Sequence, residues 1–293
     1  MTHTGLEFCF QSLYQQSVPG FRINEDGFGL SGHCAWVIDG ATGVLDERLT
    51  PGPTDAAWLV QDMSRRLENS APSAQTTGEA FSALEADLQA AFRDVTAHVP
   101  AVQDDHAPSA CLGFIRLSGV PGNGRTFVEG AFLGDVVALV QSQNGIVRWT
   151  DERAKPFERR TLAALGAEGH EPGRIPQAVR RQILENRSKL NQPDGYWVVN
   201  PRRPWAGREL TFRAAVRPEE PIVLATDGFM RLVDVFGRYS DATLHARLAA
   251  GEGESLMNEL RDLERADPVA RAHVRVKTHD DATVLVIAPE PYS

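Results

Sequence analysis

Apolar residues recur with two different periods along the chain, and these periods predict where strands and helices lie. Short apolar runs bounded by glycine or turn dipeptides predict β-strands. These runs cover residues 6–10, 35–38, 110–117, 125–134, 136–143 and 145–149. The turns PGNG, GD and NG between the last four runs suit tight reversals, so this block is predicted to form an antiparallel meander.

Apolar positions three and four residues apart predict helices in two further blocks. The first block covers about residues 55–67 and 79–98. The second follows the apolar run PIVLAT at 221–226 and continues to about Arg265, before a last strand at 283–288. Blocks of strands and helices in this order predict an α+β fold and disfavour a βαβ repeat.

Residues 153–213 break the pattern, because they are polar, rich in arginine and proline, and weakly periodic except for a predicted helix at 175–189. The chain has no internal repeat, no low-complexity linker and no clear domain boundary. A length of 293 residues is within reach of one large domain. Residues 1–293 are therefore predicted to form a single domain.

Composition and charge narrow the classes of function. The chain is 42% hydrophobic and 24% charged, as expected for a globular protein, and its net charge of -9 argues against a nucleic-acid partner. Neither a secretion signal nor an apolar run of about 18 residues is present, so we expect a cytoplasmic protein without a membrane partner. Cys9, Cys34 and Cys111 are too scattered for a disulfide framework or a zinc site.

Acidic residues fall at the ends of several predicted strands. Asp39 follows AWVI, Asp227 follows IVLAT, and Asp280 stands just before the TVLVI strand. Glu25 and Asp26, in NEDGFG, add a fourth acidic point. Strands can hold such side chains rigidly at a solvent-accessible edge of a sheet.

Carboxylates that converge repel one another unless a cation lies between them. Mg²⁺ and Mn²⁺ prefer oxygen ligands, so a few carboxylates and a backbone carbonyl suffice to bind them. Two such ions about 3.5–4 Å apart can share a water, lower its pKa and polarise a phosphoryl oxygen. Each acid also has a plainer interpretation, because Asp-Gly is common in turns and adjacent acids are common on surfaces.

Five segments in chain order resemble the motif series of the type 2C metal-dependent protein phosphatases, the PPM family. They are NEDGFG, AWVIDGATG, FLGDVVALV, LATDGFMRLVD and HDDATVLVI, and they span residues from about 20 to 289. Each motif is weak alone, and their order carries the resemblance. It implies a four-layer α/β/β/α sandwich of two antiparallel sheets, with a two-metal site at one edge.

The resemblance also implies roles for individual residues. Asp39 would bridge two Mg²⁺ or Mn²⁺ ions, and the carbonyl of Gly40 would bind one of them. Asp227 and Asp280 would bind the other ion. Asp281 stands where many members have Asn, and is expected to support the ligands.

Further acids receive weaker assignments from the same resemblance. Glu25 and Asp26 would act through the second metal ion or its waters. A weaker third ion is implied, and Asp151 or Glu152 in RWTDER lies at the corresponding place, with a surface turn as an equal alternative. Asp135, in the GD motif, is expected to be structural or to support the metal ligands.

Two phosphate-handling side chains of the family have no counterpart here. Phe21 stands where an arginine often binds the substrate phosphate, and Arg22 fills that role only if a bulge turns it to the same face. Ala41 stands where eukaryotic members commonly have a histidine that acts as general acid, so another group must protonate the leaving oxygen. The predicted catalytic residues are Asp39, Asp227 and Arg22.

Residues 153–213 correspond to the variable flap of the family. Its guanidinium groups suit phosphate oxygens, and Tyr196 or Trp197 could stack on an aromatic substrate group. The alternative is a solvated basic face with two core aromatics. The basic residues in question are Arg180, Arg181, Arg187, Lys189, Arg202, Arg203 and Arg208.

The resemblance implies a phosphoric monoester hydrolase that acts on phosphoserine or phosphothreonine in proteins by attack of a metal-bridging water. Two alternatives stay open. The same chemistry could act on a small phosphorylated metabolite, or the chain could be a catalytically weak, metal-binding regulatory domain. Retention of Asp39, Asp227 and Asp280 argues against the second alternative.

Overall fold

Two five-stranded antiparallel sheets lie face to face in the computed structural model, which describes residues 8–41, 48–99, 104–119, 126–168 and 176–291. The predicted segments that start at Leu6, Arg125 and Ile175 start outside these residues. The first sheet consists, in order across it, of β1 (Phe8–Val18), β10 (Ala282–Pro291), β9 (Ile222–Ala225), β6 (Val137–Ser142) and β7 (Gly145–Trp149). The second consists of β2 (Asp26–Ser31), β3 (Cys34–Ala41), β4 (Ser109–Gly119), β5 (Thr126–Leu133) and β8 (Leu210–Val216).

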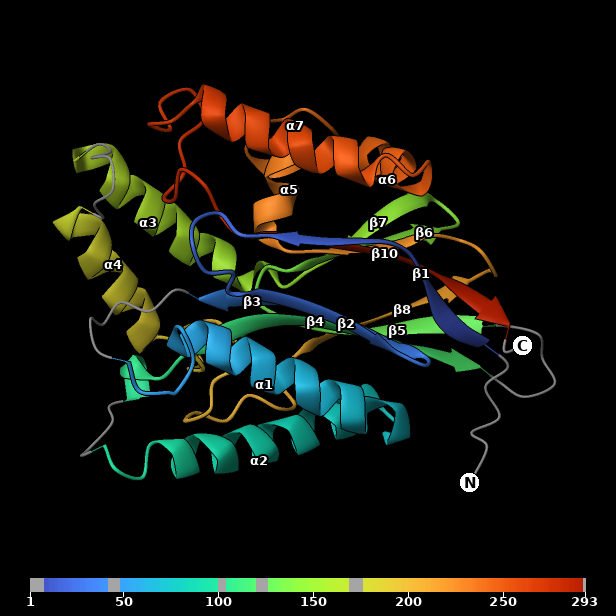
Figure 1. Cartoon of the computed structure of the whole chain (residues 1–293), viewed down its shortest axis with the longest axis horizontal. Helices are drawn as coiled ribbons and strands as arrows, with labels where there is room; N and C mark the ends of the chain where they lie inside the picture. The colour runs from blue at the N-terminus through green and yellow to red at the C-terminus, as the bar shows by residue number, and fades with distance from the viewer. Residues whose placement is uncertain (1–7, 42–47, 100–103, 120–125, 169–175, 292–293) are drawn as a thin grey trace.

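Helices cover both outer faces of the pair of sheets (Figure 1). The second sheet is covered by α1 (Asp55–Ser70) and α2 (Thr77–Val95). The first is covered by α5 (Asp227–Asp234), α6 (Asp241–Ala249) and α7 (Gly253–Ala266). Three short 3-10 helices are η1 (Ala71–Ser73), η2 (Asp104–His106) and η3 (Glu152–Ala154). The predicted four-layer α/β/β/α sandwich is confirmed.

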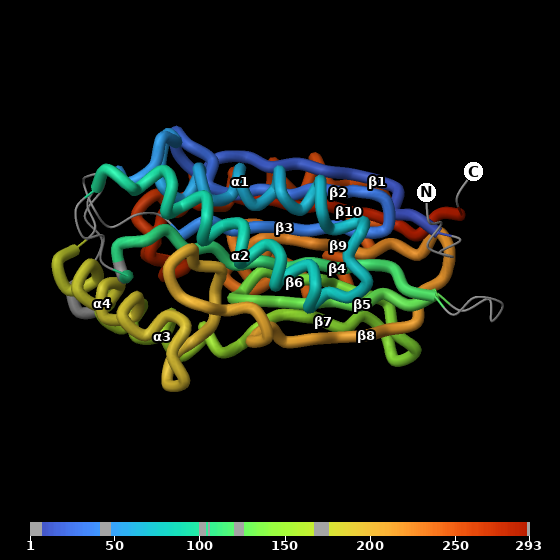
Figure 2. Tube along the Cα trace, turned by 90° about the horizontal axis from the view of Figure 1, so that it is seen from below, coloured from blue at the N-terminus to red at the C-terminus, as the bar shows by residue number. Residues whose placement is uncertain are grey.

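Two more helices, α3 (Lys155–Glu168) and α4 (Gln177–Ser188), lie at one end of the sandwich in both views (Figures 1 and 2). Strand β3 ends at the same end (Figure 1). No helix in the described ranges combines the length and apolar character that crossing a membrane requires.

Strand β3 shows why the apolar run AWVI is buried on both faces. Ala35 and Val37 pack between the sheets, whereas Trp36 and Ile38 pack under the helices α1 and α2. Successive side chains of a strand point to opposite faces, so a strand in the middle of a four-layer sandwich needs apolar residues at every position. This apolar run ends at Asp39, the first polar position of the strand.

The predicted meander over residues 110–149 is wrong at its midpoint. β4 pairs with β5 and β6 pairs with β7, but β5 and β6 belong to different sheets. The chain crosses between the sheets at Gly134 and Asp135. Gly134 has φ +76°, and a Cβ there would collide with Sγ of Cys111, so the crossing requires glycine.

Residues 153–213 contain more regular structure than their pattern predicts. The helix α4 agrees with the predicted helix at 175–189, but α3 and β8 were not predicted. β8 pairs with β5 at the edge of the second sheet, and most of its side chains are at least partly exposed. Its apolar alternation is therefore weak, although Phe212 packs flat on Trp149 at a ring-centroid distance of 5.5 Å.

Removal of the Phe132 ring should destabilise the packing between the sheets. Phe132 is fully buried and meets Trp149 and Phe212 edge to face. Phe132→Ala is expected to lower the free energy of unfolding by about 3–5 kcal/mol, measured by urea denaturation. Leu13→Ala, at an exposed apolar position, is the control and should change it by less than about 0.5 kcal/mol. Equal effects of the two substitutions would contradict this packing.

Candidate functional site

The NED and DG motifs form one corner of the second sheet. Asp26 on β2 and Asp39 on β3 are direct cross-strand partners. The Gly40 N–H donates to the carbonyl oxygen of Glu25 at 2.9 Å, and a Cβ on Gly40 would collide with that oxygen. Two carboxylates are thus held opposite each other, which costs free energy unless their charge is compensated.

The first sheet brings two further predicted ligands to this corner. Asp227 begins α5 directly after β9, and Asp280 comes shortly before β10, the neighbour of β9. The hydroxyl of Thr226 donates to Oδ2 of Asp26 at 2.8 Å and so joins the two sheets. The structure therefore brings Asp26, Asp39, Asp227 and Asp280 together from separate segments.

Burial and like charge perturb these carboxyl groups. The pKa of Asp39 is raised well above its usual range. Burial is the largest cause, and it is followed by the charges of Asp227, Asp26, Asp135 and Asp280. The pKa of Asp227 is raised to about 6, by burial most strongly and then by the charge of Asp135. A hydrogen bond with Asp39 opposes the shift. Asp135, which was expected to be structural or to support the ligands, is therefore part of the carboxylate group.

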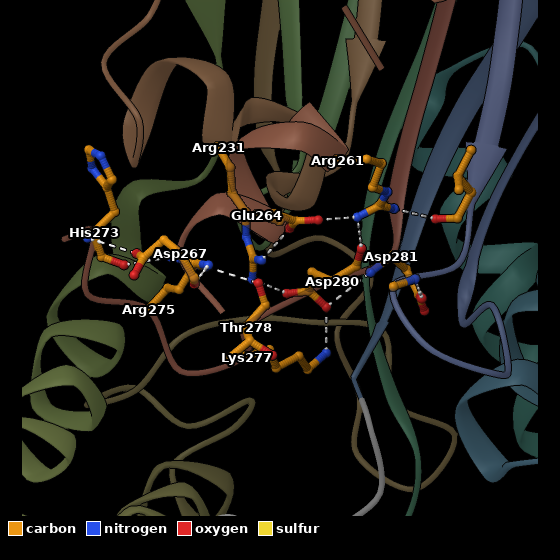
Figure 3. Close-up of polar contacts among 12 residues, drawn as sticks. Arg231, Arg261, Glu264, Asp267, His273, Arg275, Lys277, Thr278, Asp280 and Asp281 are labelled. Atoms are coloured by element: carbon orange, nitrogen blue, oxygen red, sulfur yellow. Dashed lines mark hydrogen bonds and ion pairs between the residues drawn. The ribbon is translucent and has the colours of Figure 1, made fainter. Parts of the chain in front are cut away.

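Asp280 differs from the others, because cations lower its pKa. Burial opposes the charged form, but Lys277 and Arg231 outweigh it. Nζ of Lys277 donates to Oδ1 of Asp280 at 2.7 Å, and Nη2 of Arg231 donates to Oδ2 at 2.6 Å (Figure 3). On its other side Arg231 binds the buried Glu264 at 2.9 Å. Both oxygens of Asp280 thus already have cationic partners.

Asp281 orients the backbone of the NED motif. Its two carboxylate oxygens accept the N–H groups of Gly20 and Glu25, each at 2.7 Å. This pair of hydrogen bonds fixes the segment that carries Glu25 and Asp26 against the start of β10. The contacts agree with the supporting role expected for Asp281.

The residues proposed for a third ion have other partners. Asp151 is buried, caps η3 and binds the guanidinium of Arg153 at 2.8 and 2.5 Å. Glu152 is exposed and forms an ion pair with Lys155 at 2.6 Å. The structure adds Asp135, rather than these two acids, to the carboxylate group.

Arg22 lies in the segment that Asp281 holds. Its side chain is exposed, with the guanidinium carbon 5.8 Å from the ring centroid of Phe21. The backbone of Gly20, two residues earlier, packs directly on Asp280. Arg22 is therefore close in sequence to the site, and its contact with a substrate phosphate stays a prediction.

Helices α3 and α4 bring two charged residues to this end: Arg187, one of the basic residues predicted for the flap, and Glu158, which was not predicted. Burial first, and then a hydrogen bond with Asp135, raise the pKa of Glu158 to about 9. Nη2 of Arg187 donates to the carbonyl oxygen of Ala41 at 3.4 Å. No sequence signal identifies Glu158, because the weak periodicity of residues 153–213 does not predict α3.

Several basic and aromatic side chains of the flap-like insert already have partners. The ring of Tyr196 lies 4.8 Å from that of Phe157, and Arg208 stacks on Trp197 at 4.9 Å. Lys189 binds Asp194 at 2.5 Å, Arg202 binds Asp104 at 3.0 Å, and Arg203 donates to the Leu190 carbonyl oxygen at 2.7 Å. These contacts favour the solvated basic face with packed aromatics over a preformed phosphate-binding flap.

The chemistry of the carboxylate group fits a hard divalent cation, which would relieve the repulsion between Asp39 and Asp227. Among the described residues, however, no three His, Cys, Asp or Glu side chains are placed to hold an ion together. Asp39 and Asp227 hydrogen-bond to each other, and Asp280 is bonded to Lys277 and Arg231. Joint coordination by Asp39, Asp227 and Asp280 thus requires these side chains to exchange partners.

Solved structures share this fold over nearly the whole chain. The serine/threonine phosphatase PstP/Ppp of Mycobacterium tuberculosis aligns with a TM-score of 0.55 and 15% identity, covering 97% of this chain and 99% of that one. A catalytic domain of PstP in complex with two manganese ions gives 0.54 and 13%, covering 96% and 99%. The PPM Ser-Thr phosphatase MsPP of Mycobacterium smegmatis, in complex with cacodylate, gives 0.51 and 15%, covering 97% and 98%.

No family model matches the sequence, and no curated protein matches it. The structural likeness nevertheless confirms the resemblance at the level of fold. The chain has the α+β fold of the PPM-type serine/threonine phosphatases.

The raised pKa of Asp227 should make stability depend on pH. The ordinary pKa of this carboxyl is 3.8 and its pKa in the folded chain is about 6, so the folded state binds more protons between these values. With EDTA present, the free energy of unfolding is therefore expected to gain about 1–2 kcal/mol from Asp227 as the pH falls from 7 to 5. Denaturation at several pH values measures this, and Asp227→Asn should remove the gain. An unchanged pH slope in that variant would contradict the assignment.

Proposed function

We propose that this chain is a metal-dependent phosphatase that hydrolyses phosphate monoesters, with phosphoserine and phosphothreonine in proteins as its substrates. The observation that carries the proposal is the convergence of carboxylates from both sheets at one end of a PPM-type sandwich. Asp39, Asp227 and Asp135 interact there, and burial and mutual repulsion raise the pKa values of Asp39 and Asp227. The fold is shared with serine/threonine phosphatases, one of them a complex with two manganese ions.

Two Mg²⁺ or Mn²⁺ ions would be held by Asp39, Asp227 and the carbonyl of Gly40. Asp280 would be a further ligand. Bound divalent ions supply a water of lowered pKa and polarise a phosphoryl oxygen. Glu25 and Asp26 would act from the NED segment on the waters around the ions. This segment and the DG corner are tied together by the 2.9 Å hydrogen bond between Gly40 and Glu25.

Positive side chains that could contact the substrate phosphate lie outside the carboxylate group. Arg22 is exposed in the segment that packs on Asp280, and we assign the phosphate contact to it. Arg187 reaches the end of β3 from α4 through its bond to Ala41. Guanidinium groups bind phosphate oxygens in a fork geometry, which suits Arg22 to orient the ester, with Arg187 as a second positive charge at this end.

Hydrolysis of p-nitrophenyl phosphate should require added Mn²⁺ or Mg²⁺. Asp39→Asn and Asp227→Asn are each expected to lower kcat/KM by about a hundredfold or more, because each removes a charge that the ions need. Asp262→Asn, at an exposed acid paired with Arg265 on α7, is the matched control and should leave the rate unchanged. Wild-type rates in both site variants, or activity in EDTA, would refute the metal mechanism.

The substrate class can be tested with the same preparation. Turnover of a phosphopeptide panel is expected to exceed turnover of a panel of small phosphorylated metabolites, measured as phosphate release with Mn²⁺ present. The reverse preference would replace protein substrates by metabolites while leaving the metal chemistry intact. Loss of both activities, with Mn²⁺ still bound in a calorimetric titration, would instead indicate a metal-binding regulatory domain.

A further inference from the structure

Asp280 belongs to an ion-pair network with Arg231, Glu264 and Arg261 that is neutral without Lys277. Arg231 bridges Asp280 and Glu264, and Arg261 binds the same Glu264 at 2.6 Å (Figure 3). These two arginines and two carboxylates form a neutral network of four side chains. Lys277 adds one further positive charge to it, through its 2.7 Å bond to Asp280.

The arginines of this network are fixed in place. The side chains of Arg231 and Arg261 are 7% and 11% exposed. Arg261 also donates to the carbonyl oxygens of Asp280 and Val18, each at 2.8 Å. It therefore connects α7 to the end of β1 and to the segment before β10. Removal of either arginine would leave a buried carboxylate without its counter-charge, which destabilises a fold. We therefore assign Arg231 and Arg261 to the stability of the fold.

The side chain of Lys277 is more exposed to solvent than the side chains of Arg231 and Arg261. It is 44% exposed and reaches Asp280 from three residues earlier, in the segment before β10. An ammonium on a flexible four-carbon stem can leave a carboxylate and enter water without disturbing the backbone. Exchange of the Lys277 contact therefore disturbs the fold less than exchange of the Arg231 contact, because Arg231 is buried and also binds Glu264.

Lys277 also faces the carboxylates of the proposed metal site. The charges of Asp280, Asp39 and Asp227 all act on the Lys277 ammonium. The charge of Arg231 also acts on Asp227, but the pKa values of Asp39 and Asp227 are nevertheless raised. The extra positive charge thus lies beside the carboxylates that repel one another.

We propose that the Lys277 ammonium is a displaceable counter-ion of the carboxylate group, which a divalent cation must replace at Asp280 in order to bind there. The proposal rests on the proposed metal site and is independent of phosphatase turnover. Because the ammonium and the metal ion compete for the same carboxylates, Lys277 lowers the affinity for the ion. The same charge stabilises the fold when divalent ions are scarce.

The test is a calorimetric titration of the EDTA-treated, dialysed protein with Mn²⁺. Lys277→Met removes the ammonium and keeps a side chain of similar length. The dissociation constant for Mn²⁺ is expected to fall about tenfold relative to wild type, since a competing charge has been removed. Thermal unfolding in EDTA should occur at a lower temperature in this variant, and saturating Mn²⁺ should abolish the difference.

Lys155 provides a matched control. Its side chain is also 44% exposed and is also paired with an acid three residues away, in this case Glu152. Lys155→Met should change the dissociation constant by less than about twofold. Lys277→Arg, which keeps the charge, should bind Mn²⁺ no more tightly than wild type.

Two results would overturn the proposal: unchanged or weaker Mn²⁺ binding in Lys277→Met, or equal tightening in Lys155→Met, which would reduce the effect to net charge. Tighter Mn²⁺ binding in Lys277→Met by a protein that hydrolyses no phosphate ester would reject the proposed function and leave the role of Lys277 standing. The two hypotheses therefore fail separately.

Discussion

Mutual repulsion among carboxylates at one end of the sandwich is the constraint to which the surrounding structure responds. Asp26 and Asp39 are cross-strand partners, and the charges of Asp227 and Asp135 act on Asp39 from the other side of the junction. Such an arrangement disfavours folding, so the apolar layers between and outside the sheets must offset it. The buried rings of Phe132 and Trp36 belong to two of those layers.

The two sheets compensate their acids in different ways. On the second sheet Asp26 accepts a hydrogen bond from the hydroxyl of Thr226, which in turn accepts the N–H of Thr283 at 3.0 Å. On the first sheet Asp280 is compensated by full charges, because the covering helices α5 and α7 carry Arg231 and Glu264. The hydroxyl of Thr226 is uncharged and does not neutralise Asp26, whereas Arg231 neutralises Asp280. The uncompensated charge is therefore concentrated on the Asp39 side.

Much of this site could be predicted because its signals are local. Asp39 and Asp227 each follow a buried apolar strand, and the order of the motifs was enough to predict a four-layer sandwich. Asp135 was expected to be structural or to support the ligands, but its place among the carboxylates depends on the crossing of the chain between β5 and β6, which looks like a hairpin turn in the sequence. Glu158 was missed for a similar reason, since α3 reaches the site by tertiary packing that weak periodicity does not reveal.

The uneven compensation bears on where a divalent ion would bind first. A divalent cation would relieve the repulsion that, after burial, raises the pKa values of Asp39 and Asp227. Asp280, whose pKa is lowered by Lys277 and Arg231, gains less from an added cation until one of these partners leaves. An ion at the proposed site would therefore bind first between the DG corner of β3 and the start of α5. Asp280 would join it only after its own ion pairs rearrange, so the last proposed ligand in the sequence would also be the last to bind.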